Sequence, residues 1–245
     1  MIVLNRFIKQ IYKNYFSNII FIKDKFENLR RNDTIECRES QKGFYIYMCF
    51  RNVLNKYPNM KGYLFIDDDN FVKPWELENL DLKIPWMNRI KNHFNVSKSV
   101  SPLKNSSFWK RLNNTWVNTN IILNKNKTLK HNYTKFFGSS HVVNVLVDAI
   151  YIPNTIINQF CDMVEIMYES RIFLQTAIPT VLGIMLLKKI HILTSIFLWG
   201  KERNLIIDYL TKSYSIIGIH PIKFTNKYNQ RKTKEYINFI NAIDY

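Results

Sequence analysis

The sequence predicts an α/β protein in which a sheet is flanked by helices. Short apolar runs such as residues 63–66 have the length and composition of buried strands. Segments whose apolar residues recur at helical spacing alternate with these runs, as they do in βαβ units. The chain has 245 residues, 47% of them hydrophobic, which is enough for one domain with a substantial core.

The chain is strongly basic, with a net charge of +16. Such a charge is typical of proteins that bind nucleic acid. However, the basic residues are scattered, and the joint abundance of Lys, Asn, Ile and Tyr is typical of an AT-rich coding sequence. No zinc-finger, single-strand-binding or helix-turn-helix signature accompanies the charge. Nucleic-acid binding is therefore kept only as an alternative that rests on charge alone.

The first quarter of the chain is expected to alternate helix and strand. Residues 3–15 have the apolar spacing of a basic amphipathic helix, and residues 19–22 form a short strand pattern. Residues 23–42 are charged and poorly periodic, which predicts a loop with one turn of helix. Residues 43–57 predict a helix that leads to the strand at 63–66.

Three aspartates, Asp67, Asp68 and Asp69, directly follow the apolar run at 63–66. The run predicts a strand buried on both faces, so the acids would lie at its carboxyl end, where open α/β sheets bind ligands. Adjacent carboxylates repel one another, and hard oxygen ligands suit Mg²⁺ or Mn²⁺, which could hold a diphosphate. The alternative is a solvated acidic turn that caps a short helix at Pro74.

The middle of the chain, residues 88–140, has clustered polar residues and scattered tryptophans, which leave the bounds of its elements open. Asn-x-Ser/Thr sequons suit a glycosylated lumenal loop there, and they begin at Asn95, Asn105, Asn113, Asn126 and Asn132. Trp109 and Trp116 could line an acceptor groove, or both could be buried in the core.

Strands and helices are expected again from residue 142 onward. Residues 142–152 predict one or two strands containing Asp148, and residues 155–169 a helix with Thr155 as its N-cap. A helix at 171–189 should end or kink at Pro179. Residues 192–199 predict a strand. Three cysteines leave an odd thiol even if two pair, and no run reaches the ~18 apolar residues of a membrane span.

Five blocks of the chain, taken in order, resemble the STELLO-like proteins, a family assigned as glycosyltransferases and named from plant Golgi proteins. The resemblance covers most of the chain, residues 16–225. The blocks read GYLFIDDD at 62–69, PWEL at 74–77, DAIYIP at 148–153, FLQTAIPT at 173–180 and IHPIKF at 219–224.

The resemblance implies a GT-A type fold, a mixed sheet flanked by helices, over residues 1–225, with 226–245 as a basic tail. It implies that Asp67, Asp68 and Asp69 hold Mn²⁺ or Mg²⁺ against the diphosphate of a nucleotide-sugar donor, with a glycan or protein as acceptor. It further implies three groups that meet the metal or the diphosphate, namely His220, Lys223 and Arg203. Taken without the family resemblance, a lone His-x-x-Lys sequence more often lies on the protein surface. Asp148 is assigned either to the acceptor site or to a structural role.

Two departures from the family pattern favour a non-catalytic scaffold as the main alternative to an enzyme. Gln175 stands where the family typically has Glu, and glutamine cannot accept a proton. The first strand of the GT-A fold is expected before the first helix, and this chain begins too late to supply it. Golgi or secretory localisation, and membrane association through preceding sequence, rest on the family alone.

Overall fold

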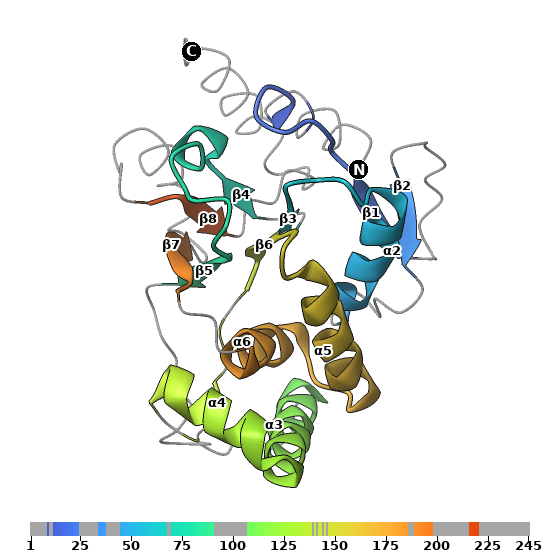
Figure 1. Cartoon of the computed structure of the whole chain (residues 1–245), viewed down its shortest axis with the longest axis vertical. Coiled ribbons are helices and arrows are strands. Elements are labelled where there is room, and N and C mark those ends of the chain that lie inside the picture. Colours follow the sequence, from blue (N-terminus) through green and yellow to red (C-terminus); the bar gives the residue numbers. More distant parts are fainter. Residues whose placement is uncertain are drawn as a thin grey trace.

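The structure is a computed structural model, and it describes residues 9, 12–24, 34–37, 45–67, 70–90, 107–138, 140, 142–143, 145, 147–185, 189–197 and 216–220 (Figure 1). At positions 88–90, 107–113, 196, 197 and 220 it describes the backbone. Most of the helix predicted at 3–15 and the basic tail at 226–245 lie outside these residues.

The main sheet has six strands in the order β3-β6-β5-β7-β8-β4. β6 runs antiparallel to both of its neighbours, β4 runs antiparallel to β8, and the pairs β5–β7 and β7–β8 are parallel. The predicted mixed sheet flanked by helices is therefore confirmed. The strands span Gly62–Ile66 (β3), Phe71–Val72 (β4), Trp86–Ile90 (β5), Ala149–Pro153 (β6), His191–Phe197 (β7) and Gly218–His220 (β8).

β6, and not β3, is the strand buried on both faces. All five residues of β6 are buried, whereas in β3 Tyr63 alone is buried and the other four are half-buried. The prediction that the strand before the aspartates is buried on both faces is wrong. β3 stands at one end of the strand order, so its apolar side chains have a neighbouring strand on one side only.

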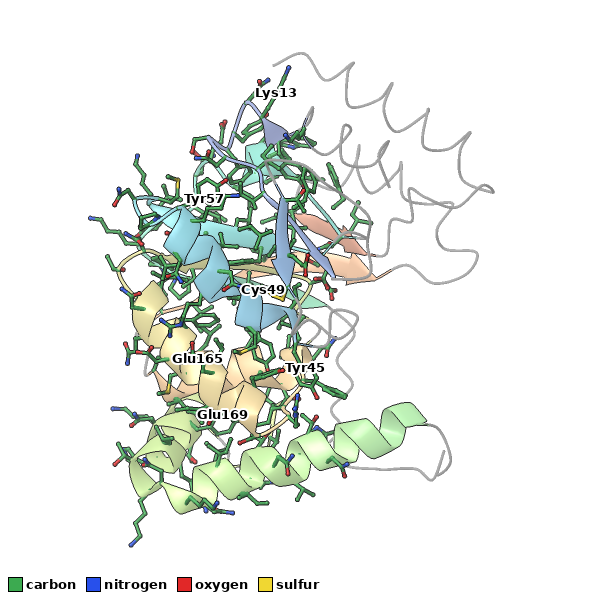
Figure 2. The ribbon with its side chains drawn as sticks, turned by 90° about the vertical axis from the view of Figure 1, so that its right-hand side faces the viewer. Lys13, Tyr45, Cys49, Tyr57, Glu165 and Glu169 are labelled. Atoms are coloured by element: carbon green, nitrogen blue, oxygen red, sulfur yellow. A yellow bond between two sulfur atoms is a disulfide. The ribbon has the colours of Figure 1, made fainter. Side chains whose placement is uncertain are left out.

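Among the described elements, three helices cover one face of the sheet and two more form an outer layer (Figures 1 and 2). α2 (Cys49–Lys56), α5 (Ile157–Glu169) and α6 (Leu174–Ile184) bury their apolar faces in the core that includes Tyr63, Ile150 and Ile152. α3 (Ser107–Lys125) and α4 (Lys127–Phe137) pack beyond them, with α4 against α6. Gly183 allows this approach, because a Cβ there would lie 2.5 Å from the Phe137 ring.

The opposite face has a smaller core around Trp86. This side chain is 2% exposed, its ring stacks on Tyr151 with centroids 4.2 Å apart, and its Nε1 donates to the Asp81 carbonyl at 3.0 Å. The Tyr151 hydroxyl donates to the Leu82 carbonyl at 3.0 Å, and burial raises its pKa to about 12. The segment after β4, including the short 3₁₀ helix η2 (Pro74–Glu76), supplies Leu77 to this core.

A second, two-stranded parallel sheet joins β1 (Phe21–Asp24) to β2 (Thr34–Cys37). The first predicted strand therefore does not lie beside β3, and the prediction of a loop at 23–42 is wrong where β2 forms. The four residues of β2 alternate in burial, a half-buried pattern too short to stand out among charged neighbours. A disulfide joins Cys37 to Cys49 at the start of α2, while Cys161 is a free, buried thiol whose pKa is raised to about 11 by burial.

The predicted loop region in the middle of the chain is helical over α3 and α4, so that prediction is wrong for residues 107–137. Asn113 lies inside α3. Asn126 is the N-cap of α4, and its side-chain oxygen accepts from the Leu129 amide at 3.1 Å. The side-chain nitrogen of Asn132, the atom that glycosylation would modify, donates to the Ile184 carbonyl at 3.1 Å. Asn95 and Asn105 lie outside the described residues, and Trp116 is half-buried.

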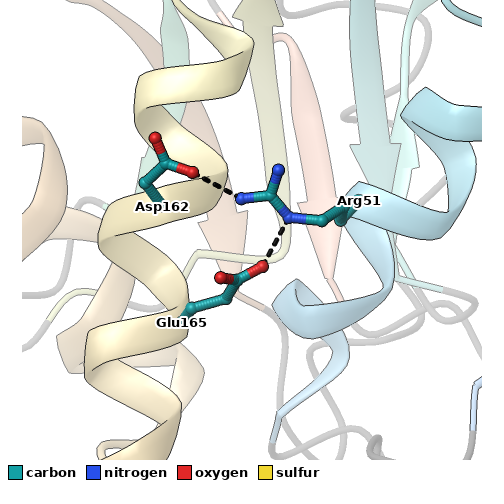
Figure 3. A network of polar contacts seen from close by, with 3 residues as sticks. All are labelled: Arg51, Asp162 and Glu165. Atoms are coloured by element: carbon teal, nitrogen blue, oxygen red, sulfur yellow. Dashed lines mark hydrogen bonds and ion pairs between the residues drawn. The ribbon is translucent and has the colours of Figure 1, made fainter.

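α5 begins one residue later than predicted, and ion pairs hold it against α2. Its N-cap is Ile156, not Thr155, and no side chain caps it. Arg51 of α2 binds two acids one turn apart on α5: Nη2 lies 2.6 Å from Asp162 Oδ1, and Nε donates to Glu165 (Figure 3). Because these groups are partly exposed, the contacts align the helices more than they stabilise the fold.

Within the part of the chain that the structure describes, no helix has both the length and the apolar character required to cross a bilayer.

Candidate functional site

Two acids from distant parts of the chain meet where β3 ends and β6 begins. The last pair in this ladder is Ile66 opposite Ala149, and just beyond it the Asp67 amide donates to the Asp148 carbonyl at 2.9 Å. Asp148 is 5% exposed and Asp67 is half-buried. The antiparallel pairing thus places the first predicted metal ligand beside the predicted acceptor-site acid.

β8 approaches the same acidic segment from the other side. β4 pairs with β8, and Phe71 lies opposite Ile219. Asn70 precedes Phe71 and His220 follows Ile219, so these two backbones flank the same end of the ladder. The Asn70 amide in turn donates to the Asp67 carbonyl at 3.0 Å. The backbone of His220 is therefore brought near the segment that begins at Asp67.

The sheet must be strongly twisted for these strands to meet. β3 and β4 stand at opposite ends of the six-stranded order, which in a flat sheet would separate them by about 24 Å. Ile66 and Phe71 are only five positions apart, and five residues span at most about 18 Å. The twist therefore brings the two outer strands toward each other (Figure 1), so that the carboxyl ends of β3 and β8 lie near the amino ends of β6 and β4.

Asp68, Asp69, Lys223 and Arg203 lie outside the described residues, as does the His220 imidazole. Among the described residues, no group of three or more His, Cys, Asp or Glu side chains is arranged to hold a metal ion. The proximity of the aspartates to the imidazole stays a prediction.

Two buried polar residues next to the aspartates were missed by the sequence reasoning. Asn70 is 5% exposed, and Lys73 is 2% exposed, with its backbone amide donating to the Ile217 carbonyl at 2.9 Å. Burial lowers the pKa of the Lys73 ammonium, while Glu76 opposes this shift. Lys73 could have been noticed as the single charge in the apolar run Phe-Val-Lys-Pro-Trp, since an isolated charge among core residues often marks a site.

Ser195 and Gly218 are neighbours on β7 and β8, in register with each other. Ser195 is 1% exposed, and a Cβ at position 218 would overlap its Oγ. Only glycine at 218 leaves room for the serine hydroxyl to lie across the neighbouring strand.

The outer edge of β4 is bound by a side chain. The Tyr12 hydroxyl donates to the Val72 carbonyl at 2.6 Å and accepts from the Val72 amide at 3.0 Å. Both free backbone groups of Val72 are thereby satisfied, and burial raises the pKa of this tyrosine well above its usual range. Tyr12 therefore fixes the strand that begins one residue after Asn70.

Pro179 lies inside α6, which continues to Ile184, so of the two predicted outcomes, an end or a kink, the helix end does not occur. Proline lacks the amide hydrogen that would bond to the carbonyl four residues earlier, that of Gln175. The Val145 amide supplies the missing donor and bonds to the Gln175 carbonyl at 3.0 Å. The proline thus frees the Gln175 carbonyl to hold the segment that leads to Asp148, three residues after Val145.

We expect Pro179→Ala to loosen this segment. The alanine amide would compete for the Gln175 carbonyl, and losing one such hydrogen bond should speed hydrogen exchange at the Val145 amide by roughly tenfold. Exchange monitored by NMR would test this, with circular dichroism to confirm that α6 persists. Thr180→Val at the next position is the control. Unchanged protection of Val145 in Pro179→Ala would contradict the assignment.

A shallow pocket lies away from these residues, on the side of α3 and α5. Its volume is about 190 Å³, and it is lined by Asn118, Ile121, Glu169, Ser170 and Arg171. It contains none of the predicted site residues. Arg171 has a φ of 54°, the left-handed conformation that ends α5, and its guanidinium lies 5.0 Å from the Tyr168 ring.

Comparison with known proteins yields one distant similarity. The chain is 21% identical over 178 residues to a protein of Arabidopsis thaliana described as probable glycosyltransferase STELLO1. The alignment covers 69% of this chain and 21% of that protein, so the chain spans about a fifth of the relative's length. No family model and no solved structure matches the chain. The chain is thus distantly similar to a protein described as a probable glycosyltransferase.

Proposed function

We propose that this chain is a GT-A type glycosyltransferase domain that binds a nucleotide-sugar through a divalent metal and transfers the sugar to a glycan or protein acceptor. The observation that carries the proposal is the meeting of Asp67, Asp148 and the end of β8, at the place where β3 and β8 end and β6 begins. Ligands of open α/β sheets bind at this edge. The distant similarity to a glycosyltransferase supports the same class.

The side chains proposed as metal ligands have the chemistry that suits a divalent metal. Asp67, Asp68 and Asp69 offer hard oxygen ligands, and His220 offers the imidazole nitrogen that Mn²⁺ also accepts. A bound Mn²⁺ or Mg²⁺ would neutralise the diphosphate as it leaves the sugar. Lys223 and Arg203 are the proposed cationic contacts to the diphosphate, since ammonium and guanidinium groups both pair with phosphate.

Asp148 and Gln175 are the proposed groups on the acceptor side. In the transfer, the acceptor hydroxyl oxygen bonds to the sugar's anomeric carbon, the bond to the diphosphate breaks, and the hydroxyl proton must be taken up. Gln175 can only donate or accept a hydrogen bond, so it is proposed to orient the acceptor while the proton passes to water. Asp148 is a buried acid whose carbonyl accepts from the Asp67 amide, and it is proposed to hold the acceptor by a hydrogen bond.

A scaffold that keeps the fold without turnover is the second candidate, and Gln175 in place of the family's Glu favours it. In either case we propose a secretory compartment, with the Golgi suggested by the similar plant family. The Cys37–Cys49 disulfide supports this, because disulfides persist mainly in oxidising compartments.

We expect Asp69→Ala to abolish metal-dependent donor binding, because it removes a ligand charge from the proposed metal site. Titration calorimetry with Mn²⁺ and a panel of nucleotide-sugars would measure this. Asp162→Asn, which removes an acid from α5 beside Arg51, is the control and should bind like the parent.

If the parent shows no metal-dependent binding to any donor, the scaffold becomes the better assignment. Salt-dependent binding to duplex or single-stranded nucleic acid would instead support the alternative that rests on the basic charge.

A further inference from the structure

Asn70 has an unusual side chain for a buried residue. It is 5% exposed, and neither its Nδ2 nor its Oδ1 has a hydrogen-bond partner. Among the residues that the structure describes, it is the one whose buried side chain leaves two polar atoms unpaired. Buried amides are almost always hydrogen-bonded, so such a group calls for a ligand. The backbone amide of Asn70, by contrast, has a partner, because it donates to the Asp67 carbonyl.

A second unpaired group lies on the same face of the sheet. Val72, Gly218 and Ser195 are in register across β4, β8 and β7, so their side-chain positions share one face. Asn70 is two residues before Val72 and keeps that face in an extended chain. The Ser195 Oγ is buried and has no hydrogen-bond partner. An amide and a hydroxyl thus lie on one face of the sheet, Asn70 just before β4 and Ser195 opposite the first residue of β8.

The chemistry of these atoms limits the ligand. A phosphate oxygen accepts hydrogen bonds and would satisfy only Nδ2, while a metal ion would satisfy only Oδ1. A hydroxyl group both donates and accepts, so adjacent hydroxyls of a sugar ring can satisfy both ends of the amide and the serine as well.

We propose that Asn70 and Ser195 bind hydroxyl groups of a sugar. This assignment rests on the proposed function and names the part of the site that holds the sugar, beside the aspartates that hold the metal. On this assignment the Asn70 amide and the Ser195 hydroxyl stay unpaired in the free protein because their partner is the ligand. Binding sites are often less stable than they could be for this reason.

An unpaired buried hydroxyl is not sufficient by itself, and Thr180 provides the matched control. It is fully buried in α6, its Oγ1 has no partner, and it lies in the helical layer instead of at the acidic end of the sheet. Thr180→Val removes an unpaired hydroxyl without changing side-chain size, so it reports the general effect of such a removal.

The test is saturation-transfer NMR with glucose, galactose, mannose and N-acetylglucosamine, each added alone to the parent, Asn70→Leu, Ser195→Ala and Thr180→Val. We expect the parent to show transfer to at least one sugar. We expect Asn70→Leu to lower the affinity for that sugar at least tenfold, Ser195→Ala to lower it several-fold, and Thr180→Val to leave it unchanged. The melting temperature of Asn70→Leu should equal or exceed that of the parent. If Asn70→Leu does not fold, Ser195→Ala decides the outcome.

Equal saturation-transfer signals in the parent, Asn70→Leu and Ser195→Ala would overturn the inference. The absence of such a signal for every sugar would overturn it as well. Calorimetry of UDP and GDP with Mn²⁺ on the same samples tests the proposed function separately. Suppose that Asn70→Leu loses the saturation-transfer signal from the sugar while the parent binds neither nucleotide. That result would support the sugar site and reject the nucleotide-sugar donor.

Discussion

Gln175→Glu is expected to raise sugar transfer, or hydrolysis of the donor, by ~10²- to 10⁴-fold, the usual contribution of one positioned base. Donor affinity should stay within a few-fold of the parent, because it depends on the metal and diphosphate contacts instead. Steady-state kinetics with the donor found by calorimetry would measure both quantities. The family resemblance places a carboxylate at this position, and the variant restores it.

The structure indicates that α6 tolerates this change. Gln175 lies in the first turn of the helix, where a negative charge is favoured by the helix dipole. Its carbonyl, which binds the Val145 amide, is untouched by the substitution. Gln175→Met, of similar length but without a proton acceptor, is the control and should not gain activity. Equal and substantial activity in the parent and the Glu variant would show that the position is structural.

Trp86→Ala is expected to cost about 3–5 kcal/mol in the free energy of unfolding, the range for removing a large buried aromatic side chain. The indole is 2% exposed, stacks on Tyr151 and donates to the Asp81 carbonyl. Domains are stable by only ~5–15 kcal/mol, so the variant should lose a large fraction of the stability of the fold. Urea denaturation followed by circular dichroism would measure the loss.

Trp86→Phe separates the two contributions, since it keeps an aromatic ring against Tyr151 and removes the indole hydrogen bond. We expect it to be considerably less destabilising than Trp86→Ala. A loss below 1 kcal/mol for the alanine variant would contradict the role of this side chain as the centre of the smaller core.

Local pattern predicted the elements whose residues follow one simple period. The apolar runs that became β3 and β7, and the helical spacing that became α2 and α5, are visible in short windows of sequence. It failed where the signal was short or masked by polar residues, as in β2 and in the asparagine-rich helices α3 and α4. Helix α4 is specified partly by Tyr133, whose hydroxyl accepts from the distant Val143 amide at 2.7 Å.

The candidate site was only partly accessible from the sequence. The three aspartates are conspicuous because carboxylates after an apolar run are chemically unusual. Asn70 and Ser195 are ordinary residue types, and their significance comes from being buried without partners. Gln175 was identified through its side chain, whereas its contact with Val145 belongs to the backbone and depends on Pro179.

The sequence by itself determined which segments form strands and helices at the strongest patterns, and where acidic groups could bind a cation. Only the tertiary structure decided that β6 is the buried strand, that β3 stands at the end of the sheet, and that β4 returns to pair with β8. The physical reason is that strand order and sheet twist arise from contacts between residues far apart in the chain. Asp67 and Asp148, 81 positions apart by number, are joined by one such contact, a backbone hydrogen bond that no local pattern encodes.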